Sequence, residues 1–151
     1  MSVVITDTKD KNRGVFSKKV FILGDTVIIG KPTAELTERT WQSLQVGINR
    51  HVRMDQPFEL VNHSCNPNCG LKLNQYGGYN LIAMKDIAIN EEITFDYCMS
   101  EWVSIAVEKC LCNDEKCRKS ITGGKDLTEK QRIEYAGFLA PFYDELIAQQ
   151  E

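Results

Sequence analysis

The sequence has no apolar run that approaches the length of a membrane-spanning helix. The N-terminal stretch MSVVITDTKDKNRG also lacks the apolar core of a secretory signal peptide. These two absences predict an intracellular protein without a membrane anchor, located in the cytoplasm or, in a eukaryotic setting, in the nucleus.

An excess of positive charge is missing as well. The chain has 18 lysines and arginines against 21 aspartates and glutamates, for a formal net charge of −3. Because a broad nucleic-acid-binding face is strongly basic, this balance argues against nucleic acid as a partner. The one short basic candidate is EKCRKS at 115–120. A length of 151 residues suits a single domain with a buried core.

Six cysteines remain to be explained, and a disulfide framework is not expected in a chain without an export signal. Three of them, Cys110, Cys112 and Cys117, follow a C-x-C-x4-C pattern that can ligate one metal ion. Structural zinc requires a fourth ligand. Spacing alone leaves five candidates for this ligand, namely Cys65, Cys69, Cys98, His51 and His63. An iron–sulfur cluster also accepts four thiolates, but zinc is the better prediction.

Short strands separated by turns are predicted for the first 97 residues. The signals are β-branched and aromatic composition, alternating polarity, and glycine or asparagine at the turns. The predicted strands cover residues 19–23, 26–30, 40–48, 79–87 and 91–97.

The C-terminal tail has a different pattern. From Thr128 onward, apolar residues recur at helical spacing, and Thr128 or Asp126 can cap the helix at its N-terminus. Pro141 must kink or restart this helix, because proline removes a backbone donor and clashes with the preceding turn. The sequence therefore predicts a mainly β (α+β) fold with a helical segment at its end.

Three polar motifs carry the chemistry: NHSCNPN at 62–68, EEITFDY at 91–97 and CLCNDEKCRKSITG at 110–123. In this order and spacing they resemble the SET-domain family of protein lysine methyltransferases. Two longer segments, NRGVFSKKVFILGDTVI (12–28) and LIAMKDIAINEEITFDY (81–97), are similar to the family as well. The resemblance covers roughly residues 12–123.

The resemblance implies a SET-domain fold of small twisted β-sheets with a pseudoknot-like crossing, in which the segment after EEITFDY threads beneath a loop. It also implies a division of the chain into a SET domain at 1–109, a post-SET zinc-binding segment at 110–123 and a C-terminal helical tail at 124–151. The implied partner is a protein or peptide that presents a lysine.

The implied cofactors are S-adenosylmethionine and zinc. In the family arrangement, the residues matching the cofactor site are Asn12, Arg13, Gly14, Asn62, His63, Tyr97 and Leu111. Cys65 becomes the fourth zinc ligand beside Cys110, Cys112 and Cys117. The ion would then hold the thiol-rich segment onto the NHSC loop.

Tyr97 is the catalytic residue that the resemblance implies. A lysine must be neutral to accept a methyl group, and with a reference pKa near 10.4 only about one in a thousand is neutral at pH 7.4. Desolvation and the positive sulfonium both favour the neutral amine. Tyr97 is expected to orient this amine rather than act as a base. Phe95 and Tyr97 would line the lysine channel, and phenylalanine at position 95 predicts di- or trimethylation.

One departure from the family pattern is Asn12, which stands where the family usually has glycine; asparagine can replace it because it tolerates left-handed backbone. Two other departures motivate an alternative. A second active-site tyrosine, common after the TVII strand, is missing, and the segment at 33–57, where the family builds part of its substrate groove, is short. The alternative is therefore a non-catalytic SET-fold module that binds a peptide or protein partner. A zinc-ribbon nucleic-acid binder is disfavoured by the net charge and leaves EEITFDY unexplained.

Overall fold

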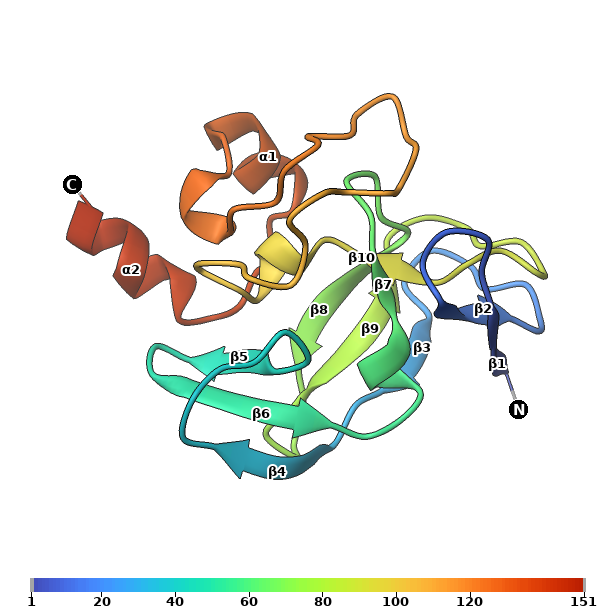
Figure 1. Cartoon of the computed structure of the whole chain (residues 1–151), viewed down its shortest axis with the longest axis horizontal. Coiled ribbons are helices and arrows are strands. Elements are labelled where there is room, and N and C mark those ends of the chain that lie inside the picture. Colours follow the sequence, from blue (N-terminus) through green and yellow to red (C-terminus); the bar gives the residue numbers. More distant parts are fainter. Residues whose placement is uncertain (1, 151) are drawn as a thin grey trace.

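The computed structural model describes residues 2–150 and contains four small β-sheets (Figure 1). A hairpin pairs β1 (Val3–Asp7) with β2 (Arg13–Ser17), and a two-stranded parallel ladder joins β7 (Asn62–His63) to β10 (Thr94–Phe95). Two three-stranded antiparallel sheets complete the set. One has the order β3 (Thr26–Ile29), β9 (Tyr79–Ala83), β8 (Cys69–Leu73), and the other β4 (Pro32–Leu36), β6 (Arg50–Met54), β5 (Leu44–Gly47). The predicted mainly β (α+β) architecture is confirmed.

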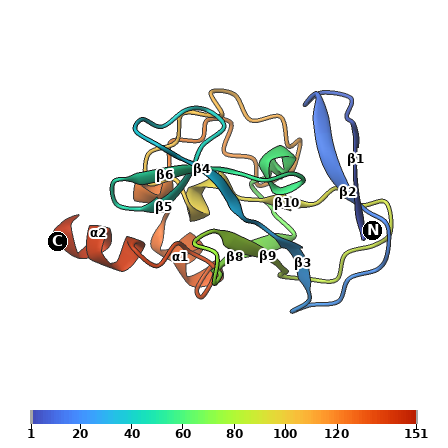
Figure 2. The ribbon, with the colours of Figure 1, turned by 90° about the horizontal axis from the view of Figure 1, so that it is seen from below.

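The core lies between the two three-stranded sheets, which form separate layers in Figure 2. Burial alternates along the central strands β9 and β6, so one face of each is buried: Tyr79, Leu81 and Ala83 of β9 are completely enclosed, and Val52 and Met54 of β6 are nearly so. The hydroxyl of Tyr79 donates to the carbonyl of Gln45 at 3.0 Å and ties the layers together. Among residues 2–150, no helix is long and apolar enough to cross a membrane.

The parallel pairing of β7 with β10 brings two distant motifs side by side. Asn62 and His63 are in register with Thr94 and Phe95, and the amide of Ser64 donates to the Phe95 carbonyl at 3.1 Å. The chain after β10 turns into a short 3₁₀ helix, η2 (Tyr97–Met99), and the C-terminal region packs over it. The amide of Gly124, for example, donates to the carbonyl of Glu101 at 2.8 Å. NHSC, FDY and the thiol-rich segment therefore meet.

Several predicted strands are shorter than expected. Residues 19–23 form only an isolated bridge between Phe21 and Ile87, because Val20, Ile22 and Leu23 are all at least 60% exposed and have no strand beside them. The segment at 91–97 is a strand only at 94–95, since Tyr97 already belongs to η2. The strands β1, β2, β4, β6, β7 and β8 lie outside the predicted ranges; β4 is mostly exposed, and in β6 only Val52 and Met54 are buried.

The helical tail is interrupted. Thr128 is the N-cap of α1 (Glu129–Glu134) and forms a capping box with Gln131, as the sequence indicated for Thr128. Helix α1 ends at Glu134, before the break expected at Pro141, because the chain turns at Gly137, whose φ is +87°; helix α2 (Tyr143–Gln150) begins after Pro141. The predicted restart at the proline is confirmed. Asp126 ends a 3₁₀ turn, η3 (Gly124–Asp126), and is not the cap.

Candidate active site

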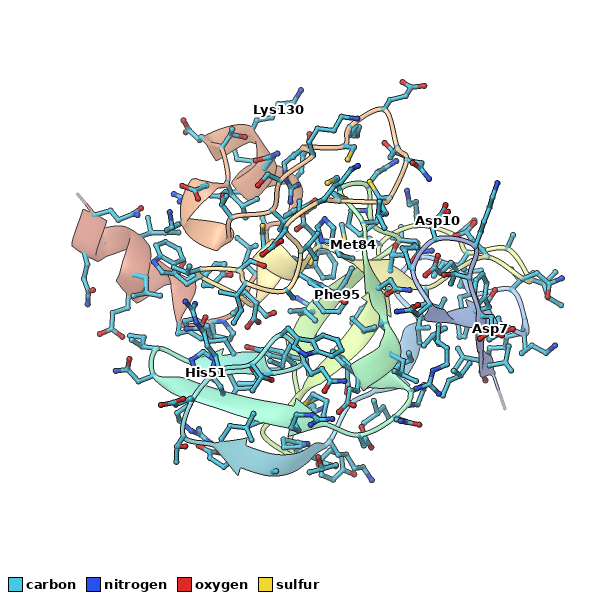
Figure 3. All side chains as sticks on the ribbon, viewed as in Figure 1. Asp7, Asp10, His51, Met84, Phe95 and Lys130 are labelled. Atoms are coloured by element: carbon cyan, nitrogen blue, oxygen red, sulfur yellow. The ribbon has the colours of Figure 1, made fainter. Side chains whose placement is uncertain are left out.

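A cavity of about 470 Å³ lies where the N-terminal hairpin loop, η2 and the thiol-rich segment converge. Phe95, on β10, lies at the centre of the view in Figure 3, and Asp10 lies in the hairpin loop. Residues singled out from the sequence that line the cavity are Asn12, Arg13, Asn62, His63, Phe95, Tyr97, Cys110 and Leu111. Gly14 is not among the lining residues. The motifs therefore contribute to one continuous surface.

The hairpin loop forms one wall of the cavity. Asn12 adopts a left-handed backbone with φ of +64°, the conformation expected for an asparagine that replaces glycine. Gly14 lies behind the wall: a β-carbon there would be 2.7 Å from Oε2 of Glu92 and 3.0 Å from Nδ2 of Asn62. The absence of a side chain at Gly14 thus allows β2 to approach Asn62 closely.

Asn62 is oriented by two acceptors. Its Nδ2 donates to the carbonyl of Arg13 and to Oε2 of Glu92, both at 2.9 Å. Because both partners accept hydrogen bonds, the orientation of the amide is unambiguous. The side-chain oxygen of Asn62 remains available to accept a hydrogen bond from a ligand in the cavity.

The ring of His63 connects Tyr97 with Cys65. Nδ1 accepts the backbone N–H of Tyr97 at 3.0 Å, so the proton of the neutral ring is on Nε2, which is 3.4 Å from Sγ of Cys65. Burial lowers the pKa of His63 to about 4, against the opposing influence of Asp96. A neutral ring with a fixed tautomer therefore orients the backbone at Tyr97.

Tyr97 has a constrained phenol. Its hydroxyl donates to the carbonyl of Val61 at 2.7 Å, and its ring packs against Phe95 at a centroid distance of 5.0 Å and His63 at 5.3 Å. Burial, followed by the negative charges of Glu101 and Glu92, raises the pKa of Tyr97 well above 10. The phenol is therefore protonated at neutral pH and serves as an orienting group, not as a base.

Phe95 provides an apolar surface beside Tyr97. Only 3% of it is exposed, and its ring also packs against Phe58 at a centroid distance of 5.8 Å. Both rings line the cavity. An amine placed between Phe95 and Tyr97 would lose most of its hydration, which favours the uncharged form.

Asp96 is the centre of a network that the sequence did not reveal. Its fully buried carboxylate accepts two hydrogen bonds from the guanidinium of Arg118, at 2.7 and 2.9 Å, and one from the hydroxyl of Tyr135 at 2.8 Å. The backbone N–H of Cys98 adds a fourth at 2.9 Å. Three segments far apart in the sequence are thereby joined directly next to Tyr97.

Four cysteines form a cluster: the Sγ atoms of Cys65, Cys110, Cys112 and Cys117 all lie within 4.8 Å of one another. Sγ of Cys65 and Sγ of Cys110 are 3.8 Å apart. A tetrahedral zinc ion with bonds of about 2.3 Å places its sulfur ligands about 3.8 Å apart, so the cluster fits this ion.

Two backbone N–H groups also donate to sulfur atoms of this cluster. The backbone N–H groups of Arg118 and Lys119 donate to Sγ of Cys65 and of Cys117, each at 3.4 Å. Of the five candidates for the fourth ligand, Cys65 joins the cluster. Cys69 and Cys98 are buried elsewhere in the core, and His51 lies on β6.

Comparison with known protein families gives one match: a sequence model described as "SET domain" covers residues 3–98. The relatives found include "Histone-lysine N-methyltransferase, H3 lysine-4 specific" of Eremothecium gossypii, 30% identical over 105 residues, or 60% of this chain and 11% of that protein. "Histone-lysine N-methyltransferase ash1" of Drosophila melanogaster is 37% identical over 76 residues, or 48% of this chain and 3% of that protein. "Methyltransferase flvH" of Aspergillus flavus is 23% identical over 111 residues, or 74% of this chain and 61% of that protein. The chain thus spans only about a tenth of the length of the H3 lysine-4 specific methyltransferases that it matches.

Proposed function

Because the chain belongs to the SET domain family, we propose that it is an S-adenosylmethionine-dependent methyltransferase that methylates the side-chain nitrogen of a protein lysine. The observation that carries this proposal is the position of Tyr97. Its protonated phenol lines the cavity beside Phe95, and its hydroxyl is fixed by the carbonyl of Val61. The relatives named for histone H3 lysine-4 make histone H3 the first substrate to test, and a nuclear site of action goes with such a substrate.

The wall formed by Asn12, Arg13 and Asn62 would hold S-adenosylmethionine, with Leu111 covering it from the thiol-rich segment. When bound, this cofactor supplies a methyl group on a positively charged sulfur. The donor set supports the assignment, because Asn62 has an unused acceptor oxygen and Leu111 is 40% exposed at the cavity. The backbone of the left-handed turn at Asn12 adds further polar groups to this wall.

The residues of the chain act on the lysine in three ways. Phe95 and the neighbouring apolar walls exclude water, which disfavours the ammonium form. Tyr97 orients the amine so that its lone pair points along the line of methyl transfer. The backbone carbonyl of Val61 fixes the phenol in that orientation.

Cys65, Cys110, Cys112 and Cys117 would bind one zinc ion as thiolates. The ion would join the NHSC loop to the segment that carries Leu111, and so close one side of the cavity. Its role is structural, because four protein ligands leave no position open for a substrate.

The experiment that tests this function compares methyl transfer from labelled S-adenosylmethionine to histone H3 and to a mixed protein lysate. Replacing Tyr97→Phe removes only the orienting hydroxyl, and we expect transfer to fall at least about a hundredfold. Tyr76→Phe, at an exposed tyrosine outside the cavity, is the matched control and should leave transfer unchanged. Equally strong methyl transfer by Tyr97→Phe and Tyr76→Phe would contradict the role proposed for Tyr97.

Mass analysis of the same products tests the number of methyl groups. Phe95 has no hydroxyl to retain a water molecule in the channel, so we expect di- or trimethylated lysine at exhaustive reaction. A product that stays monomethylated would contradict this expectation.

A peptide-binding module without activity is the second candidate. It is motivated by the lack of a second tyrosine in the cavity: among the described residues that line it, Tyr97 is the one tyrosine. Cofactor or peptide binding with no methyl transfer to any tested protein would favour this candidate.

A further inference from the structure

Glu101 follows Tyr97 closely in the chain and lines the same cavity. Its backbone N–H donates to the carbonyl of Tyr97 at 2.9 Å, and its carbonyl accepts the N–H of Gly124. The backbone of Glu101 is therefore fixed relative to Tyr97, and its side chain belongs to the cavity wall.

The two carboxylate oxygens of Glu101 have different surroundings. Oε2 accepts the hydroxyl of Ser100 at 2.5 Å and the backbone N–H of Gln45 at 3.0 Å. Within residues 2–150, Oε1 accepts no hydrogen bond, and no lysine or arginine forms an ion pair with this carboxylate. Oε1 is not among the fully enclosed polar atoms that lack a partner, so it is open to the cavity. A largely buried carboxylate without a cation is costly, because it has lost hydration without a compensating charge.

The charges of the cavity are unevenly distributed. The hairpin loop provides Asp10, Lys11 and Arg13, and Glu59, Glu108 and Lys109 line other parts of the cavity. The wall formed by residues 40–44 and 100–107 has one charged side chain among its lining residues, that of Glu101. The remaining side chains of this wall are neutral and include the 68% exposed indole of Trp41. One negative charge on a neutral wall attracts a cation specifically to that position.

We propose that Glu101 is a specificity-determining residue that binds a positively charged side chain of the protein substrate through Oε1. The inference rests on the proposed function, since it places the substrate against the wall opposite the hairpin loop. The cation has two possible sources: the ammonium of the target lysine before it loses its proton, or a lysine or arginine beside the target. Both form a charge-assisted hydrogen bond with the free oxygen.

The ionisation of Glu101 agrees with this assignment. Burial raises the pKa of Glu101 to about 7, although the hydrogen bonds from Ser100 and Gln45 and the charge of Arg39 act in the opposite direction. A cation bound at Oε1 supplies the missing charge and favours the carboxylate form. Binding of the cationic side chain should therefore release a proton.

The test measures the binding of short fluorescent peptides with one fixed lysine, in the presence of S-adenosylhomocysteine so that no methyl transfer occurs. One set has neutral residues around the lysine, and a second set has arginine or lysine beside it. Glu101→Gln removes the charge but preserves an oxygen that can accept from Ser100 and Gln45, so folding should be retained. Glu38→Gln is the matched control, because Glu38 is an exposed glutamate outside the cavity wall.

We expect Glu101→Gln to weaken peptide binding by about tenfold to a hundredfold, and Glu38→Gln to leave it unchanged. A loss with both peptide sets identifies the target lysine as the cation, and a loss confined to the second set identifies its neighbour. Glu101→Asp retains the charge on a shorter side chain, and partial recovery of binding by this variant would exclude a purely structural effect. Wild-type affinity of Glu101→Gln for both sets overturns the inference.

The outcome separates this inference from the proposed function. Methyl transfer together with unchanged peptide affinity in Glu101→Gln would refute the role of Glu101 and leave the enzyme assignment intact. Peptide binding that depends on Glu101, without any methyl transfer by the wild type, would support the cation site and refute the enzyme assignment.

Discussion

Asp96 and Glu101 lie on either side of Tyr97 in the sequence, and both carboxylates are withdrawn from bulk solvent, yet of the two only Asp96 forms an ion pair with an arginine or lysine among residues 2–150. Asp96 receives two hydrogen bonds from Arg118 and one from Tyr135. Glu101 receives its hydrogen bonds from a hydroxyl and a backbone amide.

The pKa values of the two acids reflect this difference. Burial opposes the ionisation of Asp96, but the guanidinium of Arg118 and the neighbouring groups hold its pKa below the usual range. Burial raises the pKa of Glu101 to about 7. We conclude that the charge of Asp96 is used within the fold to fix the segment next to Tyr97, whereas the charge of Glu101 is left for a ligand.

The largest effect is expected from breaking the ion pair of Asp96. Arg118→Met leaves a fully buried carboxylate without its cation and should lower the free energy of unfolding by about 3–5 kcal/mol. Chemical denaturation measures this change. Asp96→Asn introduced into the Arg118→Met chain should restore part of the loss, because the uncompensated charge is then removed.

Arg50→Met is the matched control for this prediction. Arg50 pairs with Glu35 at 2.9 Å, but both side chains are more than half exposed. Surface pairs of this kind contribute little to stability. Equal losses in the free energy of unfolding in Arg118→Met and Arg50→Met would contradict the structural role assigned to the ion pair of Asp96.

A smaller effect is expected at Glu101, where removing the charge should stabilise the folded chain at high pH. Its pKa of about 7 in the folded chain lies above the reference value of 4.5, so between these values the native state binds more protons than the unfolded state. Stability attributable to Glu101 therefore falls as pH rises through this interval. Glu101→Gln should match the wild type near pH 4 and exceed it by roughly 3 kcal/mol at pH 8.

The charged and titratable groups around Glu101 do not obscure this comparison. The phenols of Tyr97, Tyr79 and Tyr143 remain protonated over the interval because burial raises their pKa values above 10. Thermal or chemical unfolding at several pH values measures the difference between the two chains. Parallel stability curves for wild type and variant would contradict the unpaired state of Glu101.

The contrast between the two acids also marks the limit of what the sequence predicts. The residues that line the cavity in the hairpin loop, NHSC and FDY could be predicted because their spacing forms a recognisable motif. Arg118 and Tyr135 could not be linked to Asp96, since their contacts depend on how the C-terminal region folds back. Glu101 has no distinguishing sequence signal, because only the approach of Gln45 and Ser100 shows that it is buried.

Secondary structure shows the same limit. The cap at Thr128 is a local property, and the sequence predicts it correctly. The turn at Gly137 interrupts an apolar pattern that is otherwise helical, and in that turn the backbone amide of Phe138 donates to Tyr135 at 2.8 Å. Tertiary packing of the tail, in which the hydroxyl of Tyr143 donates to the carbonyl of Cys98 at 2.6 Å, overrides the helical periodicity.

The Asp96 network and the cysteine cluster both attach the C-terminal region to the β-sheets, and Arg118 contacts both, through its guanidinium and its backbone N–H. The first consists of protein groups alone, and the second is a cluster of four cysteines whose geometry fits the proposed zinc ion. Cys65 links the cluster to the NHSC loop, because it is the one cysteine of the four that comes from the middle of the chain.

Zinc content per chain, measured by elemental analysis of purified wild type, Cys65→Ser and the control Cys69→Ala, tests this junction most directly. We expect about one zinc ion in the wild type and in the control, and a loss of most of the zinc in Cys65→Ser. A Cys65→Ser chain that retains as much zinc as the wild type would contradict the account, because the thiol-rich segment would then bind its metal without the NHSC loop.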